Sequence, residues 1–385
     1  MRILLVGGAV RNILLGLPVK DRDYLVFEAT VEDFLRRFPT AKMVGKTFPI
    51  CILDGQEFSF LRGKDLAGDL TLRDFTLNAL ALDWDGTLIC HETGLEDLQA
   101  RVLRSASPRA LLDDPLRIFR AVRLSLQLPG FHLHLELCAQ MAEAAQQPGF
   151  SQLLAERVGQ EVLKAMQSES PGNFLRMLHQ THCLNVWFEE LQDAAAIPAG
   201  PPQFHDASVL EHTACLMDAL CGDALCVWMG LCHDLGKTTT PQDMLPRHIG
   251  HETRGEQLAL ALGHRLRLPM RFIKAGADAA RWHMLAGNYG TLRPATRVDL
   301  LYRLKSRALL RELFHLVHAD QRIDHLPEVM ADLEAAESVR LPAELCGLGE
   351  LSGQHLRRLR GEAIRLRQKT NPLTKLIGTR ESPSV

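Results

Sequence analysis

The spacing of apolar residues changes partway along the chain. Residues 1–90 alternate between short apolar runs and short amphipathic stretches separated by turn residues. Runs rich in β-branched and aromatic residues predict strands, and apolar residues three or four positions apart predict helices. We expect strands at residues 2–6, 24–27, 49–53 and 57–61, and helices at residues 12–17 and 31–38. This part of the chain predicts a head built on a small mixed β-sheet.

From residue 95 onward the strand signals fade and the helical spacing dominates. Helices are expected at residues 112–126, 133–144, 152–166 and 173–184. The alanine- and proline-rich segment 194–202 predicts a linker. After it, apolar residues again recur at helical spacing. The predicted fold class is α+β, with a sheet-based head followed by an all-α neck and body and a further all-α domain. The expected boundaries are 1–128 (head with the start of the neck), 129–198 (neck and body), 199–330 (third domain) and 331–385 (basic helical tail).

Composition excludes several classes of protein. The 385 residues are 46% hydrophobic and 23% charged, so a disordered chain is excluded. No apolar run is long enough to span a membrane. The nine cysteines form no CxxC pair, which favours free thiols and a reducing cytoplasm. The formal net charge of -2 argues against a protein that coats nucleic acid along its whole surface, although a local basic cleft remains compatible with it.

Two short motifs in the head point to phosphate chemistry. Gly7-Gly8 follow a predicted strand and open a helix, where backbone N–H groups can approach a phosphate. Asp21 and Asp23 stand two apart at the entry to the next strand, and a period of two predicts that both lie on one face. Two neighbouring carboxylates and a substrate phosphate are ligands that Mg²⁺ prefers. Taken singly, Gly-Gly is equally compatible with an ordinary tight turn, and a lone pair of aspartates two apart more often marks a solvated turn.

The order of these motifs resembles a known family. GGAVRNILLGLPVKDRDY is similar to the GGxVRDxLLGxxxxDxD signature of the class II tRNA nucleotidyltransferases, which are polymerase-β-like enzymes that include CCA-adding enzymes and poly(A) polymerases. LRDFTLNALALDWDG resembles their RRDFTxNAxAxDxxG motif, and LEDLQARVLRS and DDPLRIFRAVRL resemble the segments that follow. The resemblance covers residues 1–125 in order. It implies a head that transfers C or A from CTP or ATP to the 3′ end of tRNA and releases pyrophosphate.

The resemblance also implies roles for the matched positions. The ligands of the catalytic Mg²⁺ are expected to be Asp21, Asp23 and Glu57. The residues expected to bind the nucleotide are Gly7, Gly8, Arg11, Arg73, Asp74, Asn78, Arg120 and Arg123. Asp114 and Arg117 are expected to read the incoming base, and their spacing of three predicts one shared helical face.

Three departures from the family pattern bear on activity. Asn12 replaces the usual acid of GGxVRD, and Leu72 replaces the first arginine of RRD. The segment between Arg62 and Asp69 is also shorter than the family loop that helps the pocket change from C to A. These departures leave addition of CC alone, or a loss of activity in the head, as alternatives to complete CCA addition.

The second half of the chain carries an ordered set of metal-ligating residue types. His233-Asp234 ends an apolar stretch, preceded by His212 and followed by three further candidate ligands, which are His251, His283 and Asp320. This order resembles the HD-domain metal phosphohydrolases. Imidazole and carboxylate ligands suit a divalent metal such as Ni, Mn, Co or Mg. Lys237 is a candidate contact for a phosphate, and His248 is an alternative to His251.

We therefore expect a cytoplasmic CCA-adding enzyme whose HD domain acts as a phosphatase, 2′-nucleotidase or 2′,3′-cyclic phosphodiesterase. The expected partners are tRNA, CTP and ATP, without a membrane, and the expected state is a monomer or homodimer. The helical neck and the basic tail are expected to hold tRNA by phosphate contacts. The alternatives are an enzyme that adds CC only or poly(A), an HD phosphohydrolase whose inactive head binds RNA, and a non-enzymatic RNA-binding protein.

Overall fold

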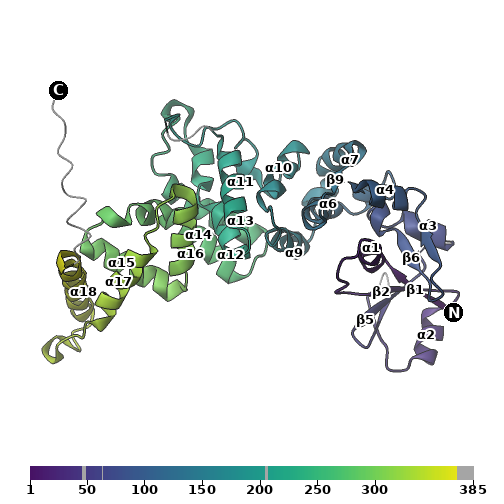
Figure 1. Ribbon diagram of the computed structural model, residues 1–385, viewed down its shortest axis with the longest axis horizontal. Coiled ribbons are helices and arrows are strands. Elements are labelled where there is room, and N and C mark those ends of the chain that lie inside the picture. The colour runs from purple at the N-terminus through teal and green to yellow at the C-terminus, as the bar shows by residue number, and fades with distance from the viewer. Residues whose placement is uncertain (46–48, 63, 204–206, 371–385) are drawn as a thin grey trace. The chain divides into compact units, whose positions relative to one another are not determined.

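A computed structural model describes residues 1–45, 49–62, 64–203 and 207–370 (Figure 1). The chain forms two compact units. Unit 1 consists of Met1–Ala165 and Met177–Trp187, and unit 2 consists of Met166–Arg176 and Phe188–Val385. Between them the chain crosses from one unit to the other three times.

Unit 1 begins with a seven-stranded mixed sheet. Its strands, in chain order, are β1 (Arg2–Val6), β2 (Asp23–Phe27), β3 (Lys42–Val44), β4 (Ile50–Leu53), β5 (Gln56–Phe60), β6 (Leu80–Leu82) and β7 (Leu88–Cys90). Their order across the sheet is β3-β4-β5-β2-β1-β6-β7. Strands β2 and β5 are parallel and the other neighbours are antiparallel. The mixed sheet predicted for the head is confirmed.

Each of the four predicted strands is present within one residue at either end. Strands β3, β6 and β7 were not predicted, because each has only three residues and offers too little alternation to detect. Helix α2 (Val31–Arg37) lies where it was expected, with a capping box between Thr30 and Asp33. Helix α1 (Gly8–Leu14) begins four residues earlier than predicted, because Gly7 turns the chain directly out of β1.

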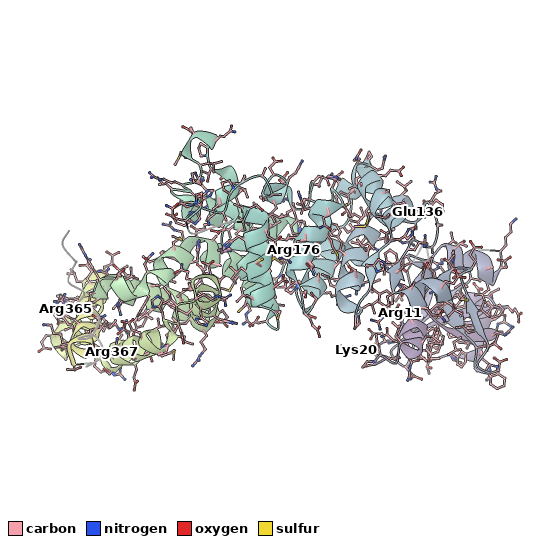
Figure 2. The ribbon with its side chains drawn as sticks, turned by 45° about the horizontal axis from the view of Figure 1, so that its top comes forward. Arg11, Lys20, Glu136, Arg176, Arg365 and Arg367 are labelled. Atoms are coloured by element: carbon pink, nitrogen blue, oxygen red, sulfur yellow. The ribbon has the colours of Figure 1, made fainter. Side chains whose placement is uncertain are left out.

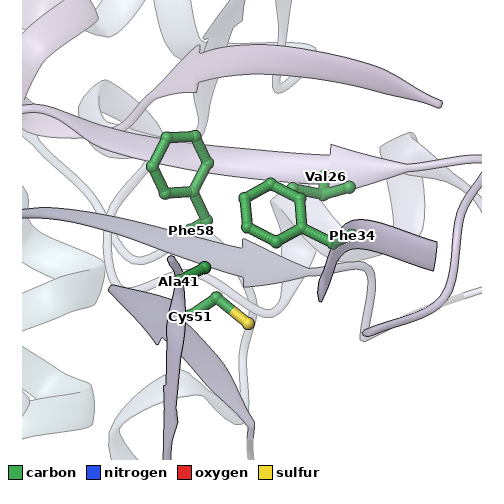
Figure 3. Close-up of a cluster of buried hydrophobic side chains, with 5 residues drawn as sticks. All are labelled: Val26, Phe34, Ala41, Cys51 and Phe58. Carbon is green, nitrogen blue, oxygen red and sulfur yellow. The ribbon is translucent and has the colours of Figure 1, made fainter. Parts of the chain in front are cut away.

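Both faces of the sheet are covered. On one face Phe34 of α2 packs into a cluster with Val26, Ala41, Cys51 and Phe58 (Figure 3). On the other face Leu25, which neighbours Val26 in β2, packs in a cluster that includes Leu4 and Val6. Successive residues of a strand point to opposite faces, so a strand buried on both faces has consecutive apolar residues.

The rest of unit 1 is mainly helical. Its helices are α3 (Leu66–Thr71), α4 (Gly94–Ala100), α5 (Ala110–Asp113), α6 (Arg117–Gln127), α7 (Leu135–Ala145), α8 (Pro148–Ser151) and α9 (Ala155–Ala165), with the 3-10 turn η1 (Thr76–Asn78). The predicted helix 112–126 is interrupted, since Pro115 disfavours a helical conformation at Asp114. Two-residue strands β8 (Val102–Leu103) and β9 (His132–Leu133) also pair within the region expected to be helical.

Unit 2 contains helices over almost its whole described length. They are α11 (Val209–Ala219), α12 (Ala224–Cys232), α13 (His251–Arg265), α14 (Met270–Gly287), α15 (Pro294–Arg307), α16 (Leu310–Gln321), α17 (Leu326–Ser338) and α18 (Glu350–Thr370), with 3-10 turns η2 (Glu189–Leu191), η3 (Leu235–Thr239), η4 (Gln242–Met244), η5 (Tyr289–Thr291) and η6 (Ala343–Leu345). Helix α10 (Gly172–Gln180) contributes its first part to unit 2 and its last part to unit 1. No helix in the described ranges is long and apolar enough to cross a membrane.

The segment predicted as a linker is packed into unit 2. Ala194 and Ala199 are buried. Pro198 forms a bridge with Ser208, and the Ala199 N–H donates to the carbonyl of Ala207. The segment 194–202, predicted as a linker, therefore lies within unit 2, where Ala194 and Ala199 are part of the buried core.

The basic tail helix uses most of its arginines within the protein. Arg357 pairs with Asp299, and Arg367 donates to Asp332 at 2.6 Å. The Arg360 guanidinium lies 3.9 Å from the centre of the Tyr302 ring. Figure 2 labels Arg367 together with Arg365 on this helix. The positive charge of α18 therefore serves largely to attach the helix to α15 and α17.

Candidate active sites

Two parallel strands bring acidic residues to one place in the head. Asp23 begins β2 and lies beside Glu57 of β5 in the strand register. Asp21 lies two residues before the first residue of β2. Its carboxylate is close enough for its charge to affect the pKa of Asp23. Protein atoms crowd the Asp23 carboxyl and raise its pKa, and the negative charge of Asp21 adds to this rise, although Arg73 opposes it.

The glycine turn lies beside these carboxylates. Gly7 has φ +72°, a conformation that glycine adopts without a Cβ clash, and it caps α1. A Cβ on Gly7 would lie 3.4 Å from an Nη atom of Arg73. Arg11 follows on α1 (Figure 2), where burial lowers its pKa to about 10. Its Nη1 donates to the Asn78 side-chain oxygen at 2.6 Å.

Asp74 organises the polar residues behind this turn. One of its carboxylate oxygens accepts from Asn78 at 3.0 Å and from the Phe75 N–H at 2.8 Å. The other accepts from Arg120 at 3.2 Å. Burial opposes ionisation, yet Arg120 and the hydrogen bonds hold the pKa of Asp74 below its usual range. Asp74 is therefore an anionic anchor that orients its neighbours.

A cavity of about 440 Å³, which we call the head cavity, joins these features. Of the predicted residues, it is lined by Gly7, Gly8, Arg11, Asp23, Arg73, Asp74, Asn78, Arg117, Arg120 and Arg123. Glu57 lines a second cavity of about 760 Å³ on the other flank of Asp23. Four lining residues were not predicted, namely Arg62, Leu124, Glu161 and Lys164. Glu161 and Lys164 belong to α9. In the sequence they look like the charged residues of any solvent-facing helix, so nothing marks them as site residues.

The predicted base-reading pair does not share a helical face. Asp114 lies between α5 and α6 in an extended conformation, and Arg117 is the first residue of α6. The Asp114 carboxylate accepts instead from Arg157 of α9 at 3.1 Å. The Arg117 guanidinium donates to the backbone carbonyls of Leu72, Arg73 and Ala110. The sequence spacing was misleading because Pro115 separates the two helices.

The departures from the family pattern have local structural consequences. The Asn12 side chain accepts from Arg11 and donates to the Pro18 carbonyl at 3.0 Å, a bond that an ionised acid could not donate. Leu72 is 43% exposed and lines the second cavity. Arg62 donates from its backbone and side chain to Asp69. These hydrogen bonds join Arg62 and Asp69, the two ends of the short segment.

The six predicted HD ligands converge in unit 2, and we call them the HD centre. They come from α11 (His212), the end of α12 (His233 and Asp234), and the helices α13, α14 and α16 (His251, His283 and Asp320). The Nε2 atoms of His212 and His233 are 3.2 Å apart, and those of His251 and His283 are 3.3 Å apart.

Asp234 connects the two pairs of histidines. Its Oδ2 lies 3.0 Å from His233 Nε2 and 3.3 Å from His212 Nε2. Its Oδ1 lies 3.4 Å from His251 Nε2 and 3.5 Å from His283 Nε2. Two groups that could each hold a metal ion therefore share this one residue.

The proton positions in the HD centre suit a divalent cation. The Nδ1 atoms of His233, His251 and His283 each bond to a backbone carbonyl, at 2.7 Å, 2.7 Å and 3.0 Å. A carbonyl only accepts, so these Nδ1 atoms carry the hydrogen and the Nε2 atoms can present lone pairs. Asp234 Oδ1 is buried without a hydrogen-bond donor in the described part of the chain. Acceptors so close together repel one another unless a cation lies between them.

The hydrogen bonds of His248 and Lys237 bear on the roles predicted for these two residues. His248 Nε2 donates to the Pro198 carbonyl and its Nδ1 bonds the Thr240 hydroxyl, so both nitrogens are already used and the ligand geometry favours His251. Lys237 donates to Asp234 at 2.7 Å and to the Ala199 carbonyl at 2.8 Å. Burial opposes the ionisation of Asp234, but the positive charge of Lys237 helps to hold its pKa well below the usual range.

Close packing fixes this arrangement. A Cβ on Gly236 would lie 1.9 Å from the backbone oxygen of His251, so only glycine lets η3 approach the start of α13. A cavity of about 780 Å³, which we call the HD cavity, opens over the centre. It is lined by five of the six predicted ligands, His212, Asp234, His251, His283 and Asp320. His233 lies beneath them and is fully buried.

Comparison with known proteins gives two family matches. The HD domain family matches residues 208–322. The family described as a probable RNA and SrmB-binding site of polymerase A matches residues 130–195.

The chain also resembles individual proteins over most of its length. It is 36% identical to the multifunctional CCA protein of Azoarcus sp., over 85% of this chain and 84% of that protein. It is 34% identical to the multifunctional CCA protein of Xanthomonas oryzae pv. oryzae, over 96% of this chain and all of that protein (100%). Among solved structures, a Thermotoga maritima CCA-adding enzyme complexed with tRNA has a TM-score of 0.65 and 17% identity, over 94% of this chain and 87% of that one. This last likeness is one of fold.

Proposed function

The chain belongs to the multifunctional CCA protein family, and we infer from this membership and its two sites that it adds C and A to the 3′ end of tRNA. CTP and ATP supply the nucleotides and pyrophosphate is released. The observation that carries this function is the head cavity, in which the Asp23 carboxylate faces a set of arginines. The HD domain adds a metal-dependent phosphohydrolase activity.

The charges of the head cavity suit a nucleoside triphosphate. We assign Arg11, Arg73 and Arg120 to binding the triphosphate, with Asp74 holding Arg120 in place. The tRNA 3′ oxygen bonds to the α-phosphorus while the bond to the leaving pyrophosphate breaks. Arginines already in position offset the charge that gathers on pyrophosphate, with no need to reorganise.

The acidic group of the head suits Mg²⁺. Asp21, Asp23 and Glu57 would hold it. Burial and the charge of Asp21 raise the pKa of Asp23, so a cation bound beside it would stabilise the carboxylate. Bound Mg²⁺ would make the attacking hydroxyl more acidic and offset phosphate charge. The support for this assignment is the register of Asp23 beside Glu57.

A narrower activity, addition of C alone, is favoured by one observation. The segment from Arg62 to Asp69 is short and its ends are joined by hydrogen bonds. It therefore has few residues with which to reshape the pocket between C and A. We keep this as the second candidate for the head.

For the HD centre we propose hydrolysis of 2′-phosphates and 2′,3′-cyclic phosphates at RNA ends. His212, His233, Asp234, His251, His283 and Asp320 would hold Ni, Mn, Co or Mg, whose role when bound is to acidify water and polarise a phosphate. The shared Asp234 suits a pair of ions. The nine cysteines are all free, which supports the reducing cytoplasm as the place of action.

Extension of defined tRNAs tests the head activity. Purified protein with Mg²⁺ is given transcripts that lack CCA or end in CC, together with CTP alone, ATP alone or both. We expect complete CCA on the first transcript with both nucleotides, and a single added A on the second with ATP. The variant Asp23→Asn should be inactive, while Asp85→Asn, on an exposed turn of the same unit, should retain activity.

Each other outcome has a defined meaning. Addition that stops at CC with both nucleotides present would establish the narrower activity. A long run of A from ATP alone would identify a poly(A) polymerase. The absence of any extension by protein with a normal melting profile would overturn the nucleotidyltransferase proposal.

A further inference from the structure

The mouth of the HD cavity carries apolar side chains that phosphate hydrolysis alone does not require. Ile249 is 68% exposed and Met284 is 42% exposed, and both line the cavity. Pro246 lines it as well. Exposed apolar surface that borders a polar floor is typical of a site that binds a ligand with an apolar part.

The segment that carries two of these residues is held rigidly. His248 connects it to Thr240 and to the Pro198 carbonyl, each at 2.8 Å. Arg254 of α13 donates to the Ile249 carbonyl at 2.9 Å and to the Thr240 hydroxyl at 3.1 Å. Residues 240–250, which we call the HD loop, are therefore fixed before any ligand arrives, and preorganisation lowers the entropy lost on binding.

The HD loop also presents a cation to the cavity. Arg247 lines the cavity and is exposed, and its guanidinium has no hydrogen bond or ion pair with any residue in the described ranges. Lys237, in contrast, already donates to Asp234 and to the Ala199 carbonyl. Of the lysine and arginine residues that line the HD cavity, Arg247 is thus the one with hydrogen-bond donors to offer a substrate phosphate.

We propose that Arg247 and Ile249 of the HD loop, with Met284 of α14, are the residues by which the HD site recognises the nucleoside phosphate. Arg247 binds an oxygen of the substrate phosphate while the HD centre acts on that group, and Ile249 and Met284 contact the nucleobase. The site therefore prefers a phosphate carried on a nucleoside over the same phosphate on a small alcohol. This inference rests on the hydrolase activity proposed above.

Two probe substrates separate the two contacts. Adenosine 2′-monophosphate has a base, whereas glycerol 2-phosphate has none. Arg247→Ala should raise KM for both by about ten- to a hundredfold, the range for a hydrogen bond to a charged group, with a smaller change in kcat. Arg247→Lys should recover part of the loss. The double variant Ile249→Ala, Met284→Ala should raise KM for the nucleotide by about tenfold and leave that for glycerol phosphate within about twofold.

A control variant and a binding measurement separate the effects on substrate recognition from effects on the hydrolytic step. Arg271→Ala, at the exposed start of α14 and outside the HD cavity, should change neither KM. Equilibrium dialysis of adenosine 2′-monophosphate against metal-stripped protein gives a Kd without turnover, and Arg247→Ala should weaken it. An unchanged Kd and KM in Arg247→Ala would overturn the role of Arg247, and equal changes for both probes in the double variant would overturn the role of the apolar pair. If wild-type protein hydrolyses neither probe, the proposed hydrolase fails, while the dialysis still tests the loop.

Discussion

At the scale of single residues, the hydrogen-bond partners of the base-reading candidates are informative. The Arg117 guanidinium donates to three backbone carbonyls, which connects the start of α6 to the end of α3 and the start of α5. The Asp114 carboxylate is instead oriented by Arg157. Arg157 therefore positions an acidic group that the family resemblance connects with base recognition, although Arg157 itself was not predicted as a site residue.

Replacing Arg157 tests this positioning role. In Arg157→Ala the Asp114 carboxylate loses one charged hydrogen bond, and the preference for CTP over UTP should fall by roughly tenfold or more. The measurement is kcat/KM for each nucleotide on a tRNA that lacks CCA. Arg109→Ala removes an exposed arginine that pairs with Asp113 and should leave the preference unchanged. An unaltered preference in Arg157→Ala would contradict the assignment.

At the scale of elements, the attachment of α18 depends on one buried acid. Asp332 of α17 is fully buried and accepts from Arg297, Arg367 and the Tyr289 hydroxyl. Arg297 is itself 1% exposed. The tail helix, the neighbouring α15 and the 3-10 turn η5 therefore meet at a single carboxylate.

Removing this acid should destabilise unit 2. Asp332→Ala removes the fully buried one of the two carboxylates that pair with the Arg297 guanidinium, and breaking a buried pair costs about 3–5 kcal/mol. Urea unfolding should show the loss, and hydrogen exchange should quicken in α15, α17 and α18. Asp299→Ala breaks the exposed pair with Arg357 and should cost about 1 kcal/mol or less. Equal effects of the two variants would show that burial is not the cause.

These elements also show what the sequence could and could not predict. The long strands of the head and the ordered HD ligands were predictable, because each has a local pattern of sufficient length. Strands of three residues and the contact between Asp114 and Arg157 were not, since both depend on partners distant in the chain. The arginines of α18 look like a nucleic-acid surface in sequence, and only their pairing with Asp299 and Asp332 shows a structural use.

At the scale of the whole molecule, the two sites belong to separate units. The head cavity is formed by residues of unit 1, and the HD centre by residues of unit 2. A net charge of -2 gives no hint of this division, because the acidic ligands offset the arginines of the head cavity and the tail. We therefore expect the two activities to respond to mutation independently.

A pair of variants tests this independence. Asp23→Asn should lower tRNA extension by roughly a hundredfold or more and leave hydrolysis of adenosine 2′-monophosphate within about twofold, because sites without shared contacts behave additively. Asp234→Asn should lower hydrolysis of adenosine 2′-monophosphate by a similar factor and leave tRNA extension within about twofold. Both activities are measured on the same preparations, with melting profiles as the control for folding. A loss of extension in Asp234→Asn would contradict the separation.

The division of α10 between the units has a consequence for synthesis on the ribosome. Unit 1 lacks Met177–Trp187 until those residues have emerged, and by then Met166–Arg176, which belong to unit 2, have already left the exit tunnel. Those residues must wait for partners such as Glu211 and Asp218, to which Arg176 binds. Unit 1 therefore cannot be completed before part of unit 2 has emerged. A nascent chain whose residues up to 187 have left the exit tunnel should contain a complete unit 1 together with a segment of unit 2, Met166–Arg176, that still lacks its partners.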